Sequence, residues 1–129
     1  MAASLQRILL VEDDPDIQAV ARLALEAVGG FTVGICSSGK EALEQAVGFA
    51  PDLILLDVMM PVMDGPTTLK ALRKLSPLRD TPVIFITAKV QTHEVESYKQ
   101  LGAVDVISKP FDPMNLSSTI HAIWATYYA

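Results

Sequence analysis

The sequence has little of the features that mark secreted, membrane-spanning or low-complexity proteins. Its 129 residues contain a single cysteine, Cys36, so an internal disulfide is excluded. The apolar run nearest the N-terminus extends only over residues 8–11, which is too short for a signal sequence or a membrane span. Seven glycines and eight prolines are close to average usage, which excludes collagen-like and low-complexity chains. We therefore expect a soluble, intracellular protein that works in the cytoplasm, away from membranes.

Basic residues are also scarce relative to acidic ones. Ten Lys and Arg against fifteen Asp and Glu give a formal net charge of -5. A domain that binds nucleic acid usually presents a basic face, so we expect no direct nucleic-acid binding by this chain. The apolar content of 50% is enough for one hydrophobic core and is too high for a disordered chain. The sequence predicts one domain over residues 1–129.

Five short apolar runs alternate with helical patterns along the chain. Each run is rich in Val, Ile and Leu and is bounded by residues that break regular structure, which is typical of strands buried on both faces of a parallel sheet. The runs cover residues 8–11, 31–36, 53–56, 83–86 and 104–107. Because crossovers between parallel strands are right-handed, the helices must lie on both faces of the sheet. The sequence predicts an α/β fold, a doubly wound (βα)5 open sandwich.

Capping residues mark where the helices begin. Asp14 before Pro15 predicts one helix start, and Ser38 with Glu41 forms a capping box at another. The expected helices cover residues 15–28, 39–50, 66–75 and 90–101, and a last one follows Pro113. The first should turn inward Ile17, Val20, Ala21, Ala24 and Val28, and the last should bury Leu116, Ile120, Ile123 and Tyr127.

Polar residues stand at the carboxyl ends of four of the five predicted strands. Residues 12–14 are all acidic and follow the first strand, Asp57 ends the third, Thr87 ends the fourth and Lys109 follows the fifth. In such folds ligands bind at this edge of the sheet. Converging carboxylates repel one another unless a cation joins them, which predicts a hard divalent cation such as Mg²⁺. With the Lys109 amine and the Thr87 hydroxyl beside them, we expect metal-assisted handling of a phosphoryl group.

Within this group Asp57 is the expected nucleophile. It stands alone at the end of a central strand, whereas Glu12 and Asp13 lie together as cation ligands. Carboxylates that form aspartyl phosphates are an established form of covalent catalysis. Asp14 is expected to cap the following helix rather than to bind the cation.

Four segments of the chain resemble the receiver domain of two-component response regulators. They are residues 7–14 (RILLVEDD), 51–65 (PDLILLDVMMPVMDG), 82–88 (PVIFITA) and 102–111 (GAVDVISKPF), in the order and spacing of that family. The resemblance implies a flavodoxin-like fold with strand order 2-1-3-4-5. It also implies a signalling domain rather than a turnover enzyme. No output domain is expected in this chain, because the five βα units use nearly all of its residues.

The resemblance assigns a role to each acidic residue. It implies that Asp57 is the phosphoacceptor, which takes a phosphoryl group from a sensor histidine kinase or a histidine phosphotransfer protein. Asp13 and Asp57 would bind Mg²⁺, or Mn²⁺, directly, and Glu12 would bind it through water. Met59 matches the position whose backbone carbonyl completes the metal ligands.

The same resemblance covers the residues around the phosphoryl group and the partners. Thr87 and Lys109 match the hydroxyl and amine that contact phosphoryl oxygens, Ala88 leaves room for the phosphate, and the Lys109–Pro110 bond is expected to be cis. The implied output is a downstream protein effector or output domain. A homodimer is expected through the face formed by the fourth helix, the fifth strand and the fifth helix.

Two positions depart from the family pattern or modify it. Val106 stands where the family usually has Tyr or Phe, so the aromatic half of the conformational switch is missing. Met59 offers a hydrolytic water no useful hydrogen bond, which predicts slow loss of the phosphoryl group.

The alternative function is a pseudo-receiver that binds partners without phosphorylation. A haloacid-dehalogenase-type phosphatase would need an aspartate at Met59, and a flavin-binding protein would need a Ser/Thr/Gly-rich loop after the first strand.

Overall fold

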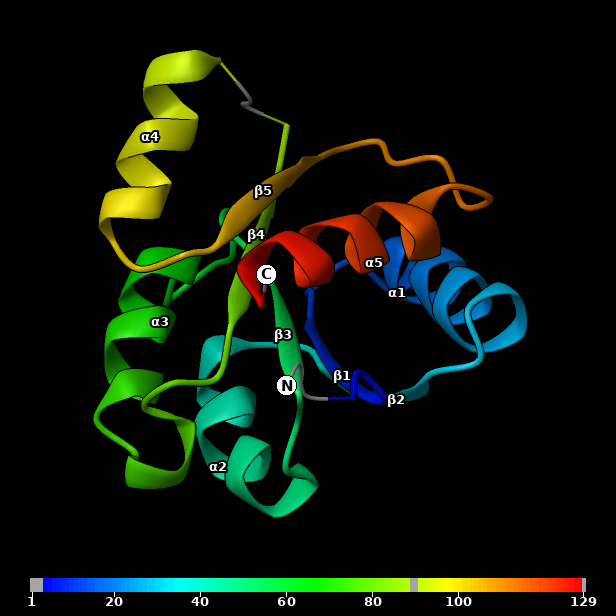
Figure 1. The fold of residues 1–129 in the computed structure, drawn as a ribbon. Helices are drawn as coiled ribbons and strands as arrows, with labels where there is room; N and C mark the ends of the chain where they lie inside the picture. The colour runs from blue at the N-terminus through cyan, green and yellow to red at the C-terminus, as the bar shows by residue number, and fades with distance from the viewer. Residues whose placement is uncertain (1–3, 89–90, 129) are drawn as a thin grey trace.

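The sheet has the architecture predicted from the apolar runs. The computed structural model describes residues 4–88 and 91–128. In it β1 (Arg7–Val11), β2 (Thr32–Cys36), β3 (Leu53–Asp57), β4 (Val83–Thr87) and β5 (Asp105–Ser108) form one parallel sheet in the order β2-β1-β3-β4-β5 (Figure 1). Each strand begins and ends within one residue of its expected range. The (βα)5 fold and the strand order 2-1-3-4-5 are confirmed.

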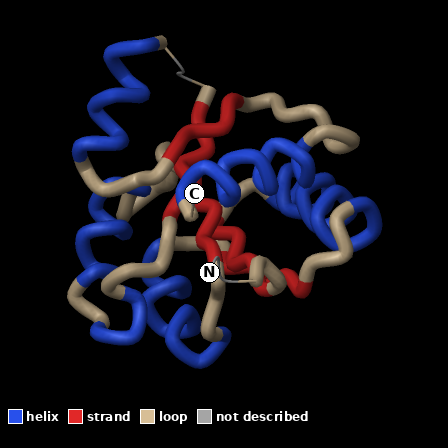
Figure 2. Tube along the Cα trace, viewed as in Figure 1, coloured by secondary structure: helices blue, strands red, loops and turns tan. Residues whose placement is uncertain are grey.

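The helices lie on both sides of the strands (Figure 2). They are α1 (Pro15–Arg22), η1 (Leu23–Val28), α2 (Gly39–Phe49), α3 (Gly65–Arg73), η2 (Ser76–Leu78), α4 (Thr92–Gln100) and α5 (Leu116–Tyr127). Both predicted caps are present, because Asp14 accepts a 2.8 Å bond from the Asp16 amide and Ser38 accepts one of 3.1 Å from the Glu41 amide. Val90, the expected first residue of the fourth helix, lies outside the described residues.

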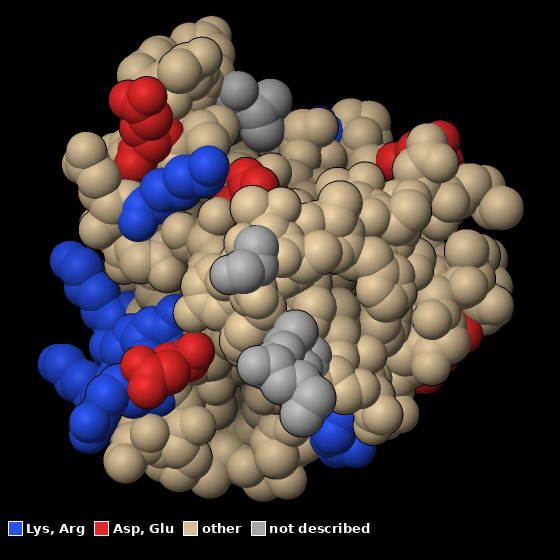
Figure 3. Space-filling view, in the orientation of Figure 1, with Lys and Arg blue, Asp and Glu red and all other residues tan. Residues whose placement is uncertain are grey.

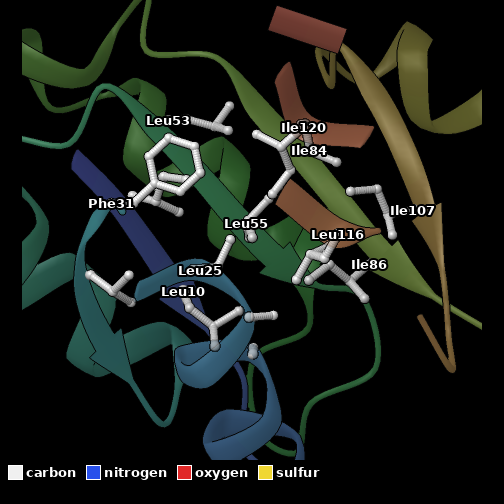
Figure 4. Close-up of a cluster of buried hydrophobic side chains, with 14 of the residues drawn as sticks. Leu10, Leu25, Phe31, Leu53, Leu55, Ile84, Ile86, Ile107, Leu116 and Ile120 are labelled. Atoms are coloured by element: carbon white, nitrogen blue, oxygen red, sulfur yellow. The ribbon is translucent and has the colours of Figure 1, made fainter. Parts of the chain in front are cut away.

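Two hydrophobic clusters cover the two faces of the sheet. One joins α1, η1 and α5 to the strands and contains Leu25, Phe31, Leu55 and Ile120 (Figure 4). The other packs α2, α3 and the Tyr98 ring of α4 against the opposite face. All the residues of β3 and β4 are buried, as the continuous apolar runs predicted. This packing fixes the carboxyl ends of the strands, where the candidate site lies.

The first helical segment differs from its expected form. The α-helix stops at Arg22 and continues as a π-helix to Val28, where the Gly29 amide bonds the Ala24 carbonyl at 3.1 Å. The wider π turn changes which side chains face the sheet. Leu25 is fully buried, whereas Val28 is 46% exposed and Val20 is 40% exposed. The expected inward position of Val28 is therefore wrong, and so is that of Val20, which lies in α1 before the π turn.

The last two helices are attached to the sheet to different degrees. α4 buries none of its residues. α5 buries Leu116, Ile120 and Trp124, but Tyr127 is 46% exposed, so the expected burial of Tyr127 is wrong. Tyr127 lies near the helix end, where its ring packs on Tyr128 with centroids 4.8 Å apart.

The surface carries its charges unevenly despite the acidic balance. On the face shown in Figure 3, Lys and Arg side chains gather over α3 and the turn that follows it. This group of basic side chains does not test whether the chain binds nucleic acid. The expectation that it does not bind nucleic acid stays a prediction. Among the described residues, no helix has the length and apolar character needed to cross a membrane.

Candidate functional site

The site lies at the edge of the sheet where the strands end. Asp57 is the last residue of β3 and Thr87 the last of β4, and both are 2% exposed. Glu12 follows β1 directly and Lys109 follows β5. The ladder pairs Thr87 with Ser108, next to Lys109 in the chain. The structure therefore brings the residues predicted at the strand ends to one edge.

Three carboxylates form the acidic part of the site. One oxygen each from Glu12, Asp13 and Asp57 lie within 4.8 Å of one another. Glu12 and Asp57 are buried, whereas Asp13 is exposed. Carboxylate oxygens are the ligands that Mg²⁺ prefers, and the exposed Asp13 leaves one side of the group open to solvent. The donor set fits the divalent cation predicted from the sequence.

Lys109 joins two of these carboxylates. Its Nζ lies 2.7 Å from Glu12 Oε1 and donates a 2.9 Å hydrogen bond to Asp57 Oδ1. Burial raises the pKa of Glu12 to about 7, and the Asp57 carboxylate adds to the rise against opposing bonds from Lys109 and the Asp14 amide. Burial lowers the pKa of Lys109, but its bonds to both carboxylates outweigh this, so its pKa lies above the usual value. Lys109 therefore stays charged and balances the acidic group.

The acidic turn after β1 is held by a residue that the sequence did not single out. Gln18 Nε2 on α1 donates to the Glu12 carbonyl at 2.5 Å and to Ser37 Oγ at 3.1 Å. The Glu12 amide bonds the Cys36 carbonyl at 3.0 Å, and its Oε2 accepts a 3.1 Å bond from the Asp14 amide. The sequence did contain one signal for this role, an amide side chain one helical turn after the acidic cluster. The contact between Gln18 and the Glu12 carbonyl, however, depends on where α1 packs.

The segment after Asp57 packs tightly against the start of α3. A Cβ on Gly65 would lie 2.5 Å from the Asp57 carbonyl oxygen, so this close approach needs glycine. The Met59 side chain is 69% exposed, and Met60 is buried. The ligand role of the Met59 carbonyl stays a prediction. Val62 has a φ of 69°, which is unusual for a β-branched residue.

The other side of the site is built by the ends of β4 and β5. The Lys109 amide donates to the Thr87 carbonyl at 2.9 Å, and the Lys109–Pro110 bond is cis as expected. Val106 is half-buried in the cluster that also holds Tyr98. The Tyr98 ring packs edge-on against Phe85 with centroids 5.2 Å apart. An aromatic ring from α4 thus lies in the cluster that holds Val106.

A groove opens beside Lys109, between α1 and the segment after β5. Its volume is about 380 Å³, and its walls are mostly apolar. The lining residues are Asp16, Ile17, Val20, Ala88, Lys109, Pro110 and Phe111. An apolar groove next to a charged site is a suitable surface for a protein partner.

Comparisons with known proteins agree with this geometry. Residues 8–121 match the family described as the response regulator receiver domain. The chain is 39% identical over 106 residues to a probable C4-dicarboxylate response regulator, DctR, of Halalkalibacterium halodurans, which covers 81% of this chain and 45% of that protein. It is 36% identical over 118 residues to the Bacillus subtilis alkaline phosphatase synthesis transcriptional regulatory protein PhoP, which covers 92% of this chain and 48% of that protein. The chain spans about half the length of these curated relatives.

Solved structures show the same fold. The chemotaxis response regulator CheY4 of Vibrio cholerae superposes with a TM-score of 0.85 at 31% identity, which covers 93% of this chain and 99% of that chain. The receiver domain of the sensor histidine kinase PA1611 from Pseudomonas aeruginosa has a TM-score of 0.81 at 31% identity, which covers 95% of this chain and 99% of that one. It was crystallised with a magnesium ion in the active site cleft. With the family match, the fold and these relatives in agreement, this chain belongs to the response regulator receiver domains, the signalling modules of two-component systems.

Proposed function

We propose that this chain accepts a phosphoryl group on Asp57 in a two-component phosphorelay. The observation that carries the proposal is the setting of that carboxylate. Asp57 ends a central buried strand, lies 2.9 Å from Lys109 Nζ and shares the acidic group with Glu12 and Asp13. A pseudo-receiver would have no need for this arrangement, which leaves phosphorylation as the function that fits the site best.

The transfer step uses a carboxylate oxygen of Asp57 as the nucleophile. The oxygen attacks phosphorus of a phosphohistidine, the P–O bond forms, and the P–N bond breaks with its electron pair passing to the imidazole nitrogen. Lys109 and the Thr87 hydroxyl then contact phosphoryl oxygens and balance their charge. A Mg²⁺ or Mn²⁺ ion held by Asp13, Asp57 and the Met59 carbonyl, and by Glu12 through water, would supply electrostatic neutralisation of the transferred group.

The groove beside Lys109 supports a protein as the phosphoryl donor. Ile17, Val20 and Phe111 give it apolar walls, and Lys109 at its side leads to the acidic group. A helix of a sensor histidine kinase or a histidine phosphotransfer protein would present its phosphohistidine there. The expected output is a protein effector or output domain, or a homodimer through α4, β5 and α5. We infer that the single receiver domain of residues 1–129 acts in the cytoplasm, where the buried Cys36 stays reduced.

The aspartyl phosphate should be lost slowly. Met59 lies two residues after Asp57 in the sequence, and its thioether is a weak hydrogen-bond acceptor with no donor for an attacking water. We expect the phosphorylated protein to persist well beyond a few seconds in Mg²⁺. Loss of the phosphoryl group within a few seconds would contradict this role of Met59.

Intact mass spectrometry after treatment with Mg²⁺ and acetyl phosphate tests the proposed function. Wild-type protein should gain the mass of one phosphoryl group, and Asp57→Asn should gain none. Asp80→Asn is the matched control, because Asp80 is an exposed aspartate just before β4, at the edge of the sheet opposite the site, and its variant should be labelled like wild type. Lack of labelling of the wild type by acetyl phosphate and by phosphorylated histidine donors would refute the proposal and favour the pseudo-receiver.

A further inference from the structure

Gln18 connects three segments that meet at the acidic end of the site. Its side-chain amide extends from α1 and donates to the Glu12 main-chain carbonyl at 2.5 Å. The same nitrogen donates to Ser37 Oγ at 3.1 Å, in the loop between β2 and α2. One half-buried side chain therefore ties α1, the turn after β1 and the turn after β2 together.

The carbonyl that Gln18 binds belongs to the peptide group that joins Glu12 to Asp13. Because a peptide group is planar, fixing its oxygen also fixes the direction in which the chain enters Asp13. The Glu12 side chain has further restraints, because it is buried and pairs with Lys109 and the Asp14 amide. Asp13 is exposed, so burial does not hold its carboxylate, and its position depends on the backbone.

Electrostatic repulsion acts against this position when no cation is bound. One oxygen of Asp13 lies within 4.8 Å of one oxygen each of Glu12 and Asp57, and like charges at this distance repel. Lys109 contacts the two buried carboxylates, at 2.7 Å and 2.9 Å. A restraint on the Asp13 backbone therefore keeps the ligand near the others before a cation arrives.

We propose that Gln18 is a positioning residue for the cation site. It acts through the Glu12–Asp13 peptide and holds the Asp13 carboxylate close to Asp57, so that less reorganisation is needed when Mg²⁺ binds. This inference rests on the proposed function, because it assigns Gln18 a part in the metal step of phosphorylation. Its effect belongs to Mg²⁺ affinity and not to the chemistry at phosphorus.

The test measures Mg²⁺ binding to the purified chain by isothermal titration calorimetry, with no phosphodonor present. Gln18→Met keeps the length of the side chain and removes its donors. We expect about fivefold weaker Mg²⁺ binding, equivalent to about 1 kcal/mol, the size of one hydrogen bond. Gln100→Met is the matched control, because Gln100 is an exposed residue at the end of α4, and its variant should bind Mg²⁺ like wild type.

A second measurement separates positioning from a general structural role. In labelling with acetyl phosphate, the Mg²⁺ concentration for half-maximal rate should rise about fivefold in Gln18→Met, whereas the rate at saturating Mg²⁺ should match wild type. Unchanged Mg²⁺ affinity in Gln18→Met would overturn the inference. So would a reduced rate at saturating Mg²⁺ with an unchanged half-maximal concentration.

Wild-type protein provides a readout that does not depend on the variant folding. By nuclear magnetic resonance, the side-chain amide protons of Gln18 should exchange with solvent at least tenfold more slowly than those of Gln100. Equal exchange rates would overturn the inference. Absence of Mg²⁺ binding by wild-type protein would overturn the proposed function along with it, whereas normal wild-type binding with no effect of Gln18→Met would overturn this inference alone.

Discussion

Replacing Lys109 with methionine removes the cation that lies between two buried carboxylates. Glu12 and Asp57 expose 1% and 2% of their side chains, and their oxygens lie 2.7 Å and 2.9 Å from Lys109 Nζ. Breaking a buried ion pair by removing one partner costs about 3–5 kcal/mol, because the remaining charge is left unpaired. A typical domain has a free energy of unfolding of about 5–15 kcal/mol, so this loss is a large fraction of the total.

The loss should depend on pH in a defined direction. The pKa of Glu12 is raised to about 7 even with Lys109 present, so at pH 5 this carboxyl carries a proton. Protonation removes one of the two unpaired charges. We therefore expect Lys109→Met to cost about 3–5 kcal/mol at pH 8 and clearly less at pH 5.

Urea denaturation in EDTA at both pH values measures the free energy of unfolding without a divalent cation. Lys99→Met is the matched control, because Lys99 Nζ lies 4.0 Å from Asp105 in an exposed pair, which is worth less than about 1 kcal/mol. A loss in Lys109→Met no larger than that of Lys99→Met would refute the reasoning. An equal loss at pH 8 and pH 5 would refute the part assigned to Glu12.

Three further predictions concern the same edge of the sheet. Without a divalent cation, the free energy of unfolding of the wild type should fall by up to about 3 kcal/mol as the pH rises from 4.5 to 7. The reason is that folded Glu12 keeps a proton over this range that the unfolded chain releases. Urea denaturation of Glu12→Gln should not show this fall. Gly65→Ala should lower the free energy of unfolding by about 1–3 kcal/mol, because its Cβ would meet the Asp57 carbonyl oxygen, whereas Gly48→Ala meets nothing within 4 Å and should not destabilise. Val62→Asn should raise the thermal midpoint and add about 1 kcal/mol to the free energy of unfolding, because asparagine tolerates the left-handed backbone at a φ of 69°. An unchanged midpoint would contradict this.

The strands and the main site residues could be predicted because local patterns determine them. Continuous apolar runs between breakers gave strand ends within one residue of those observed. Parallel strands share one edge for their carboxyl ends, which was enough to expect Asp57, Glu12 and Lys109 together. The caps at Asp14 and Ser38 followed from side-chain chemistry alone.

Features that depend on packing between elements could not be predicted in this way. No distinctive residue marks the change from α-helix to π-helix at Leu23. As a result of this change Leu25 is buried, whereas Val28, which was expected to be buried, is exposed. The contact of Gln18 with the Glu12 carbonyl requires the position of α1 over the strand ends, which periodicity does not give. The Tyr98 contact with Phe85 joins residues of α4 and β4, and its geometry likewise arises from tertiary packing.

The two hydrophobic clusters lie on opposite sides of one sheet, and this separation has a consequence for how such a protein changes over evolution. The groove beside Lys109 is lined by α1 and the segment after β5, whereas α4 packs with the opposite cluster. Substitutions that reshape the groove should leave the packing beneath α4 undisturbed. Their effects on stability should add to those of substitutions on the α4 side, because the pairs share no contacts. The groove and the α4 surface can therefore change independently within one domain.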